Sequence, residues 1–215
     1  MTKATSINCL FVDVGGVLLS NGWDESARRR AAKHFRHPFA EVEERHRLAF
    51  DAYEEGRLTL QDYLSLVVYP EKRPFTRAAY VRFMMAQSRP FPDMLALVHR
   101  LKLRHGLKVV VVSNEGRELN DHRIRKFRLE RFVDTFVSSC FVHLRKPDPR
   151  IFALALDVAR VEPRNVVYIE NTPMFVQVAE GDGIRSILHR DFRTTRDALA
   201  ALGLPDDESV GHDAR

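Results

Sequence analysis

The sequence predicts an α/β fold in which helices cover both faces of a doubly wound, Rossmann-like parallel sheet. Five short apolar runs rich in β-branched residues supply the strands, and segments of helical periodicity separate the last four. Near-continuous apolar runs are typical of parallel strands, because both faces of such a sheet are buried. The expected strands are 7–12, 108–113, 134–139, 165–170 and 184–188.

The first expected strand, 7–12, is followed by a long stretch with no convincing strand. Residues 20–90 are rich in Arg and Glu, and glycines and prolines interrupt their helical patterns. We therefore expect a small helical insertion over 20–90, placed within an α/β core domain that is formed by 1–19 and 91–204.

Helix signals are clear in the second half of the chain. Pro92 marks a first turn and Gly106 a stop, with apolar residues at helical spacing between them. Asp148 is expected as an N-cap, with Pro149 at the first helical position. These signals predict helices that begin at about 92 and 149.

The last predicted helix comes from the segment TTRDALAALG, which begins at a threonine and ends at Gly203. The residues after it, 205–215, are polar, and we expect them to form a disordered tail.

Composition describes an ordinary globular chain. Its 215 residues are 45% hydrophobic and 29% charged, and the net charge of +5 is spread along the sequence. We therefore expect no nucleic-acid partner. No apolar run is long enough for a membrane span or a signal peptide, which predicts a cytoplasmic protein without a membrane partner.

The chain has two cysteines, Cys9 and Cys140, which lie far apart in unlike contexts. Two such residues supply neither a disulfide framework nor a zinc site. We expect both to be buried as small hydrophobic side chains.

Polar residues stand at or near the ends of four expected strands. Ligands of doubly wound sheets bind beyond the carboxyl ends of the strands, so these side chains are expected to converge there. Taken singly, each has an ordinary explanation as a turn residue, a solvated lysine or a helix cap. The candidates are Asp13, Ser113, Asn114, Lys146, Glu170 and Asn171.

Four segments carry a resemblance to a known family. In order, FVDVGGVL, VVVVSNEG, RKPDPRIF and VVYIENTP are similar to the motifs of the haloacid dehalogenase-like hydrolases, which are mostly phosphatases. The resemblance covers the chain except its tail, and residues 20–90 lie where this family places a helical cap. It implies a hydrolase that transfers a phosphoryl group.

The resemblance also implies roles for individual residues. Asp13 is the expected nucleophile, which forms an aspartyl-phosphate that water then hydrolyses. The expected Mg²⁺ ligands are Asp13, the carbonyl of Gly15, Glu170 and Asn171. The expected phosphate-binding residues are Ser113, Asn114, Lys146 and Gly16, with Lys146 also catalytic and Gly16 allowing a tight turn.

The sequence departs from the family pattern at two places. Gly15 stands where the phosphatases carry a second Asp that serves as general acid and base. Glu170 and Asn171 replace an acidic pair, so we expect weaker Mg²⁺ binding. Glu115 is the best candidate in the sequence for the missing acid.

Three functions follow from these observations. The first is a Mg²⁺-dependent phosphatase of a small phosphorylated metabolite, with activity reduced by the lost acid. The second is a weak or inactive relative that binds a phosphorylated ligand or a protein. The third, a 2-haloacid dehalogenase, is disfavoured because those relatives carry an aromatic residue at the position of Gly15.

Overall fold

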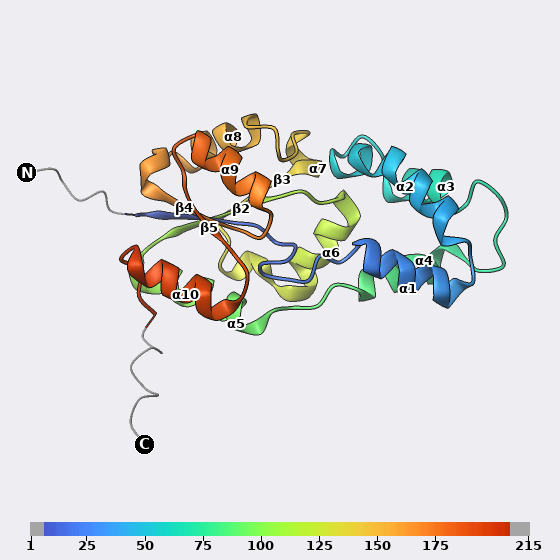
Figure 1. Ribbon diagram of the computed structural model, residues 1–215, viewed down its shortest axis with the longest axis horizontal. Helices are drawn as coiled ribbons and strands as arrows, with labels where there is room; N and C mark the ends of the chain where they lie inside the picture. Colours follow the sequence, from blue (N-terminus) through green and yellow to red (C-terminus); the bar gives the residue numbers. More distant parts are fainter. Residues whose placement is uncertain (1–6, 207–215) are drawn as a thin grey trace, which may run out of the picture.

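The computed structural model describes residues 7–206 and confirms the predicted α/β fold (Figure 1). Five parallel strands form one sheet in the order β3-β2-β1-β4-β5. Each strand lies within one of the five apolar runs, and β1 occupies the centre. The strands are β1 Cys9–Val12, β2 Lys108–Ser113, β3 Thr135–Ser138, β4 Val166–Glu170 and β5 Arg185–Leu188.

Helices cover both faces of this sheet, as expected for a doubly wound fold (Figure 1). The side chains of β1 alternate between two hydrophobic clusters, with Leu10 and Val12 in one and Cys9 and Phe11 in the other. The first cluster includes residues of α5 and α10, and the second includes residues of α8 and α9. The core helices are α5 Pro92–His105, α6 Arg117–Phe127, α7 Ser139–Val142, α8 Arg150–Ala159, α9 Pro173–Gly181 and α10 Phe192–Ala201.

Two single-turn 3₁₀ helices, which the sequence pattern did not predict, complete the core. They are η1 Leu129–Arg131 and η2 Pro163–Asn165.

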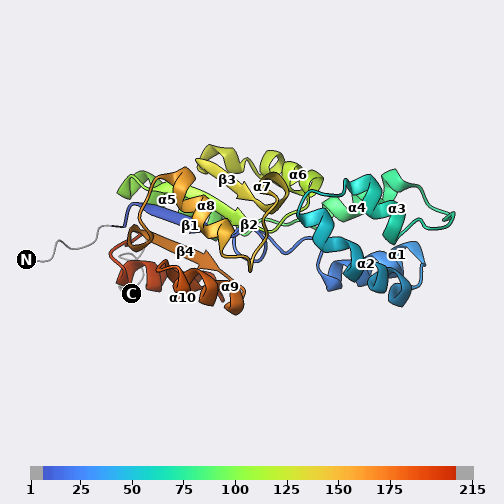
Figure 2. The ribbon, with the colours of Figure 1, turned by 90° about the horizontal axis from the view of Figure 1, so that it is seen from above.

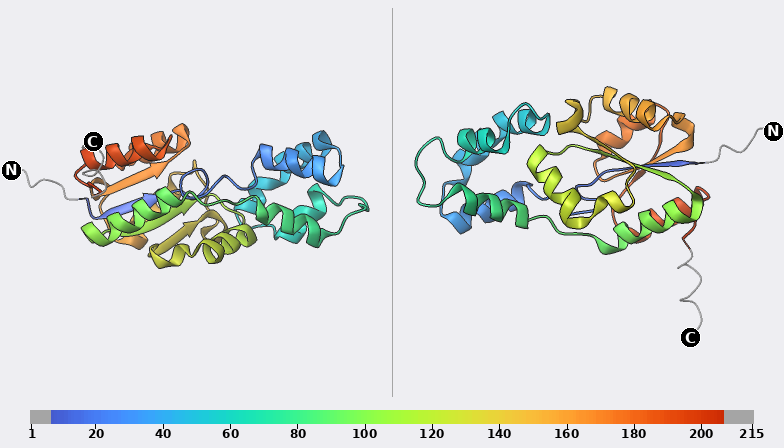
Figure 3. Two further views of the ribbon diagram at one scale, coloured as in Figure 1. Left: turned by 90° about the horizontal axis from the view of Figure 1, so that it is seen from below. Right: turned by 180° about the vertical axis from the view of Figure 1, so that it is seen from behind.

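The segment between β1 and α5 contains four helices that form a separate lobe beyond the carboxyl ends of the strands (Figures 2 and 3). We call this lobe the cap. It has a hydrophobic core of its own, to which Trp23, Tyr63, Tyr80 and Met84 belong. The cap helices are α1 Glu25–Phe35, α2 Phe39–Glu54, α3 Leu60–Val67 and α4 Arg77–Ala86.

Two helix starts differ from the sequence prediction. The helix expected to have Pro149 as its first residue begins at Arg150, because Pro149 takes the cap position and the Asp148 carboxylate accepts a hydrogen bond from the Arg150 amide. The last helix begins before its threonines, at Phe192. Asp191 caps it by accepting a hydrogen bond from the Thr194 amide at 2.8 Å.

The remaining predictions concern the cysteines, the tail and membranes. Cys9 and Cys140 are buried and unpaired, as expected. Of the expected tail, Asp206 is buried and forms an ion pair with Arg100, whereas 207–215 lies outside the described residues. No helix between residues 7 and 206 is both long and apolar enough to span a membrane.

Candidate active site

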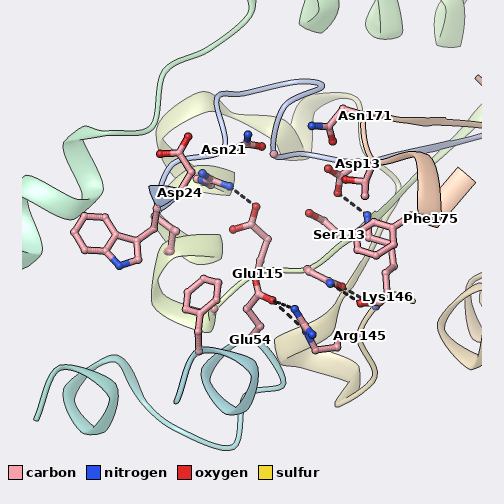
Figure 4. Close-up of a pocket in the computed structure, with 18 of the residues that line it drawn as sticks. Asp13, Asn21, Asp24, Glu54, Ser113, Glu115, Arg145, Lys146, Asn171 and Phe175 are labelled. Carbon is pink, nitrogen blue, oxygen red and sulfur yellow. Dashed lines mark hydrogen bonds and ion pairs between the residues drawn. The ribbon is translucent and has the colours of Figure 1, made fainter. Parts of the chain in front are cut away.

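A cavity of about 360 Å³ lies between the sheet and the cap (Figure 4). Residues that follow β1, β2 and β4 line its inner end, and residues of the cap line its outer end. Seven of the predicted site residues line it, whereas Gly16 and Glu170 lie just outside the lining. The seven are Asp13, Gly15, Ser113, Asn114, Glu115, Lys146 and Asn171.

Asp13 lies at the carboxyl end of the central strand, where its backbone amide donates to Ile169 O at 3.0 Å. Its side chain is buried, and Lys146 Nζ donates to Asp13 Oδ1 at 2.9 Å. Burial raises the pKa of Asp13 to about 6 although Lys146 lowers it. Burial and the Lys146 ammonium thus act in opposite directions on the proton affinity of the Asp13 carboxyl.

Lys146 binds the carboxylates of Asp13 and Glu170. Its buried ammonium donates to Glu170 Oε2 at 2.6 Å and to the Tyr168 hydroxyl at 2.9 Å, in addition to Asp13. Burial alone lowers the pKa of Lys146, but Asp13 and Glu170 outweigh it and raise the pKa above its ordinary value. Lys146 therefore stays protonated, and its ammonium balances part of the negative charge of Asp13 and Glu170 at the inner end of the cavity.

The two residues at the end of β2 have different surroundings. The buried Ser113 hydroxyl lowers the pKa of the Asp13 carboxyl and so favours its ionised form. Asn114 uses its side chain to hold the backbone of Lys146, donating to Lys146 O at 2.9 Å and accepting from Lys146 N at 2.8 Å. The side chain of Asn114 thus positions the backbone of Lys146.

Oxygen atoms suited to a cation gather beside Asp13. The side-chain amide of Asn171 is 2.9 Å from Glu170 Oε1 and 3.1 Å from Gly15 O, and with its nitrogen facing them it donates to both. Turning the amide over brings three oxygens together next to the Asp13 carboxylate, a donor set that fits Mg²⁺. Among the described residues, however, no three His, Cys, Asp or Glu side chains form a metal-binding group.

Gly16 is required by the backbone at this point. Its φ of +81° lies in the left-handed region, and a Cβ there would be 2.2 Å from Asn171 Nδ2. Gly16 therefore shapes the turn beside Asn171 and contributes no lining surface.

Gly15 has an ordinary backbone conformation, so the missing side chain is not a conformational necessity. A Cβ at Gly15 would meet Asn21 Oδ1 at 3.5 Å and Arg123 Nη1 at 3.9 Å, both ordinary contacts. The same Arg123 nitrogen donates to the carboxylate of Glu115, which faces the cavity (Figure 4). Burial raises the pKa of Glu115 to about 7 although Arg123 lowers it, so this carboxyl group exchanges a proton near neutral pH.

Arg123 also connects the core to the cap. Its Nε donates to Ser88 Oγ and its Nη2 donates to Ser20 O, both at 3.1 Å. Ser20 and Ser88 belong to the two chain crossings between core and cap. The buried guanidinium of Arg123 thus binds Glu115 and both segments that connect the core to the cap.

Replacing Arg123 by Met is expected to lower the free energy of unfolding by about 3 kcal/mol, because the buried Glu115 loses its charged partner. Urea denaturation followed by far-ultraviolet circular dichroism measures the loss. Arg125→Met, on the exposed side of the same helix, is the matched control and is expected to be near neutral. Equal losses in the two variants would contradict the assigned role.

The docked cap contributes further contacts. Arg145 donates to Glu54 Oε2 at 2.7 Å, the Ser139 hydroxyl donates to Glu54 O at 2.6 Å, and the ring of Tyr53 lies where a Cβ on Gly116 would be. The end of α2 therefore rests on the core beside the cavity.

Among the residues of this region that sequence reasoning did not single out, four bind predicted site residues or join the cap to the core: Glu54, Arg123, Arg145 and Tyr168. Tyr168 had a usable signal, since it lies two residues before Glu170 in a strand and thus on the same face of the sheet. Arg145 adjoins Lys146, whereas Glu54 and Arg123 lie on helices whose distant partners no local pattern identifies.

Comparisons with known proteins agree with this geometry. A sequence model described as haloacid dehalogenase-like hydrolase matches residues 7–180. A phosphorylated carbohydrates phosphatase of Thermotoga maritima is 25% identical over 193 residues, covering 84% of each chain. A phosphatase of Mycobacterium tuberculosis is 27% identical over 213 residues, covering 92% of this chain and 96% of the relative.

Solved structures share the fold. A HAD family enzyme of Bacteroides thetaiotaomicron in complex with magnesium and inorganic phosphate superposes with a TM-score of 0.73 at 22% identity, over 86% of this chain and 95% of that one. Two other curated relatives are much longer, and the chain spans 11% and 12% of their length. With a family match over 7–180 and motif residues gathered at one cavity, the chain belongs to the haloacid dehalogenase-like hydrolases.

Proposed function

We propose that the protein is a Mg²⁺-dependent phosphatase of a small phosphorylated metabolite and forms an aspartyl-phosphate on Asp13. The observation that carries the proposal is a buried Asp13 carboxyl group at 2.9 Å from the Lys146 ammonium, inside a cavity that the cap covers. The two curated phosphatase relatives support the same reaction class.

In this mechanism the phosphoryl group of the substrate lies between Asp13, Ser113 and Lys146. An Asp13 oxygen attacks phosphorus, the bond from phosphorus to the leaving oxygen breaks, and the leaving oxygen takes a proton from the Glu115 carboxyl. Water then attacks the aspartyl-phosphate, gives a proton back to Glu115, and releases phosphate with Asp13 restored.

Charge compensation is the main contribution of the surrounding residues. Lys146 offsets the negative charge that develops on the phosphoryl oxygens in a buried site, where charges interact more strongly than in bulk water. Asp13, Gly15 O, Glu170 and Asn171 would hold Mg²⁺, which supplies further positive charge beside the phosphate.

Wild-type protein is expected to bind Mg²⁺ with half-saturation above the low micromolar range, because only two carboxylates face the ion. Asn171→Asp should tighten Mg²⁺ binding by about tenfold, since a third carboxylate adds a negative charge at the site. Isothermal calorimetry measures both values without any turnover. Asn165→Asp, in η2 away from the cavity, is the control, and an equal gain there would count against these ligands.

One assay separates phosphatase activity from the other two candidates. Purified protein is offered phosphate esters and 2-chloropropionate, each with Mg²⁺ and with chelator. Phosphate release that requires Mg²⁺ supports the proposal, and halide release without metal would replace it with a dehalogenase. Binding of phosphate esters without release of either product would indicate a binding protein.

A further inference from the structure

The arginines at the outer end of the cavity are already bound to carboxylates. Arg28 donates to the two carboxylate oxygens of Glu43 at 2.7 and 2.8 Å. Arg145 donates to Glu54 at 2.7 and 3.1 Å, and Arg123 is paired as described above. The positive charge of each of these arginines is therefore already balanced before a ligand binds.

Carboxylates at the same end of the cavity exceed these cations. Asp24 faces the cavity and accepts the Ala27 amide at 2.7 Å as the cap of α1, and it forms no ion pair within residues 7–206 (Figure 4). Glu54 Oε2 receives both hydrogen bonds from Arg145, whereas no hydrogen bond to Glu54 Oε1 exists in the described part of the chain. Because ionised carboxylates only accept hydrogen bonds, this end of the cavity offers acceptors.

Burial makes additional negative charge costly here. It raises the pKa of Glu54 above its ordinary value although Arg145 lowers it, and it raises the pKa of Glu115 as well. Charges close together in a buried site interact far more strongly than in water. A further anion is repelled by these groups, whereas a hydroxyl or ammonium donor stabilises them.

We propose that the substrate is a phosphate ester whose alcohol part presents hydroxyl or ammonium donors toward Asp24 and Glu54 and carries no anionic group. This inference rests on the proposed phosphatase function. The expected phosphate-binding group, the Lys146 ammonium, lies at the inner end beside Asp13 and Glu170. The outer end instead offers acceptor oxygens of Asp24 and Glu54 that no arginine among residues 7–206 occupies. The cavity therefore orients such an ester with its phosphate toward Asp13.

Glycerol 3-phosphate and 3-phosphoglycerate form a matched pair for the test, since they differ at one end by a hydroxymethyl group against a carboxylate. We expect kcat/KM to favour glycerol 3-phosphate by at least about tenfold, because like charges at close range disfavour the wrong ligand. Phosphoethanolamine, assayed beside them, shows whether an ammonium donor serves as well as a hydroxyl.

Two variants test whether Glu54 causes the preference for glycerol 3-phosphate over 3-phosphoglycerate. Glu54→Gln removes the charge at nearly constant size and should reduce the preference for glycerol 3-phosphate several-fold. Asp51→Asn is the matched control, because Asp51 contacts the same arginine at 3.2 Å from outside the cavity, and it should leave the preference unchanged.

Equal kcat/KM values for the two esters, or equal effects of the two variants, would overturn the inference. If no ester is hydrolysed, the proposed function fails, but the inference is still tested by calorimetric binding of the same pair to the wild-type protein. Tighter binding of glycerol 3-phosphate would then support it, and equal or weaker binding would refute it.

Discussion

Asp13→Asn is expected to lower kcat/KM for phosphate esters by about 10⁴-fold or more, because an amide cannot form the aspartyl-phosphate. The substitution keeps the size of the side chain. It also leaves Lys146 with its 2.6 Å contact to Glu170, so the fold should persist. A retained melting temperature shows that the loss is chemical.

The intermediate gives a second readout. Wild-type protein quenched in acid during turnover of a ³²P-labelled ester should retain label that hydroxylamine releases, as expected for an acyl phosphate. Asp13→Asn should retain none. Asp157→Asn, an exposed residue of α8 far from the cavity, is the control and should label like wild type. Labelling of Asp13→Asn would mean that another residue is the nucleophile.

The strands could be predicted because their signal is local. Short apolar runs rich in β-branched residues located all five strands, since the central strands of such a sheet are buried on both faces. The long interval after the first strand indicated the inserted helices. Helix starts were less predictable, because neighbouring residues compete for the same cap. Both Asp191 and the threonines at 194 and 195 can cap α10, and the structure uses Asp191.

The residues of the candidate site also differ in how well the sequence predicts them. Asp13 directly follows β1, and Ser113 and Glu170 are the last residues of β2 and β4, so topology places them together once the sheet order is known. The ion pairs of the outer cavity depend on the docking of the cap. Glu54 meets Arg145 across 91 residues of chain, and no local pattern contains that information. The roles of all these residues remain predictions.

Glu115→Gln is expected to lower kcat/KM by about 10²–10⁴-fold for esters of ordinary alcohols, because their leaving oxygen needs a proton. For p-nitrophenyl phosphate, whose leaving group is stable as an anion, the loss should be much smaller. A loss of equal size for both substrates would point to a structural role for Glu115.

The dependence of kcat/KM on pH should also differ between esters of ordinary alcohols and p-nitrophenyl phosphate. The pKa of Glu115 is about 7, so its proton-donating form predominates below that pH. With ordinary alcohol esters, kcat/KM should therefore fall as pH rises through about 7 in the wild type, and Glu115→Gln should remove this limb. With p-nitrophenyl phosphate the limb should be absent in both proteins, and its presence there would assign it to another group.

A substitution at Gly15 also tests whether Glu115 supplies the proton. A Cβ added at Gly15 would lie near Arg123 Nη1, the same nitrogen that donates to Glu115. Gly15→Asp fits the backbone, and in the Glu115→Gln background its carboxyl group can take over both the contact with Arg123 and the proton transfer. We expect the double variant to recover at least about tenfold in kcat/KM on ordinary alcohol esters. Gly15→Asn in the same background fills the same space without an acid, so recovery there would show that volume rather than proton transfer was missing.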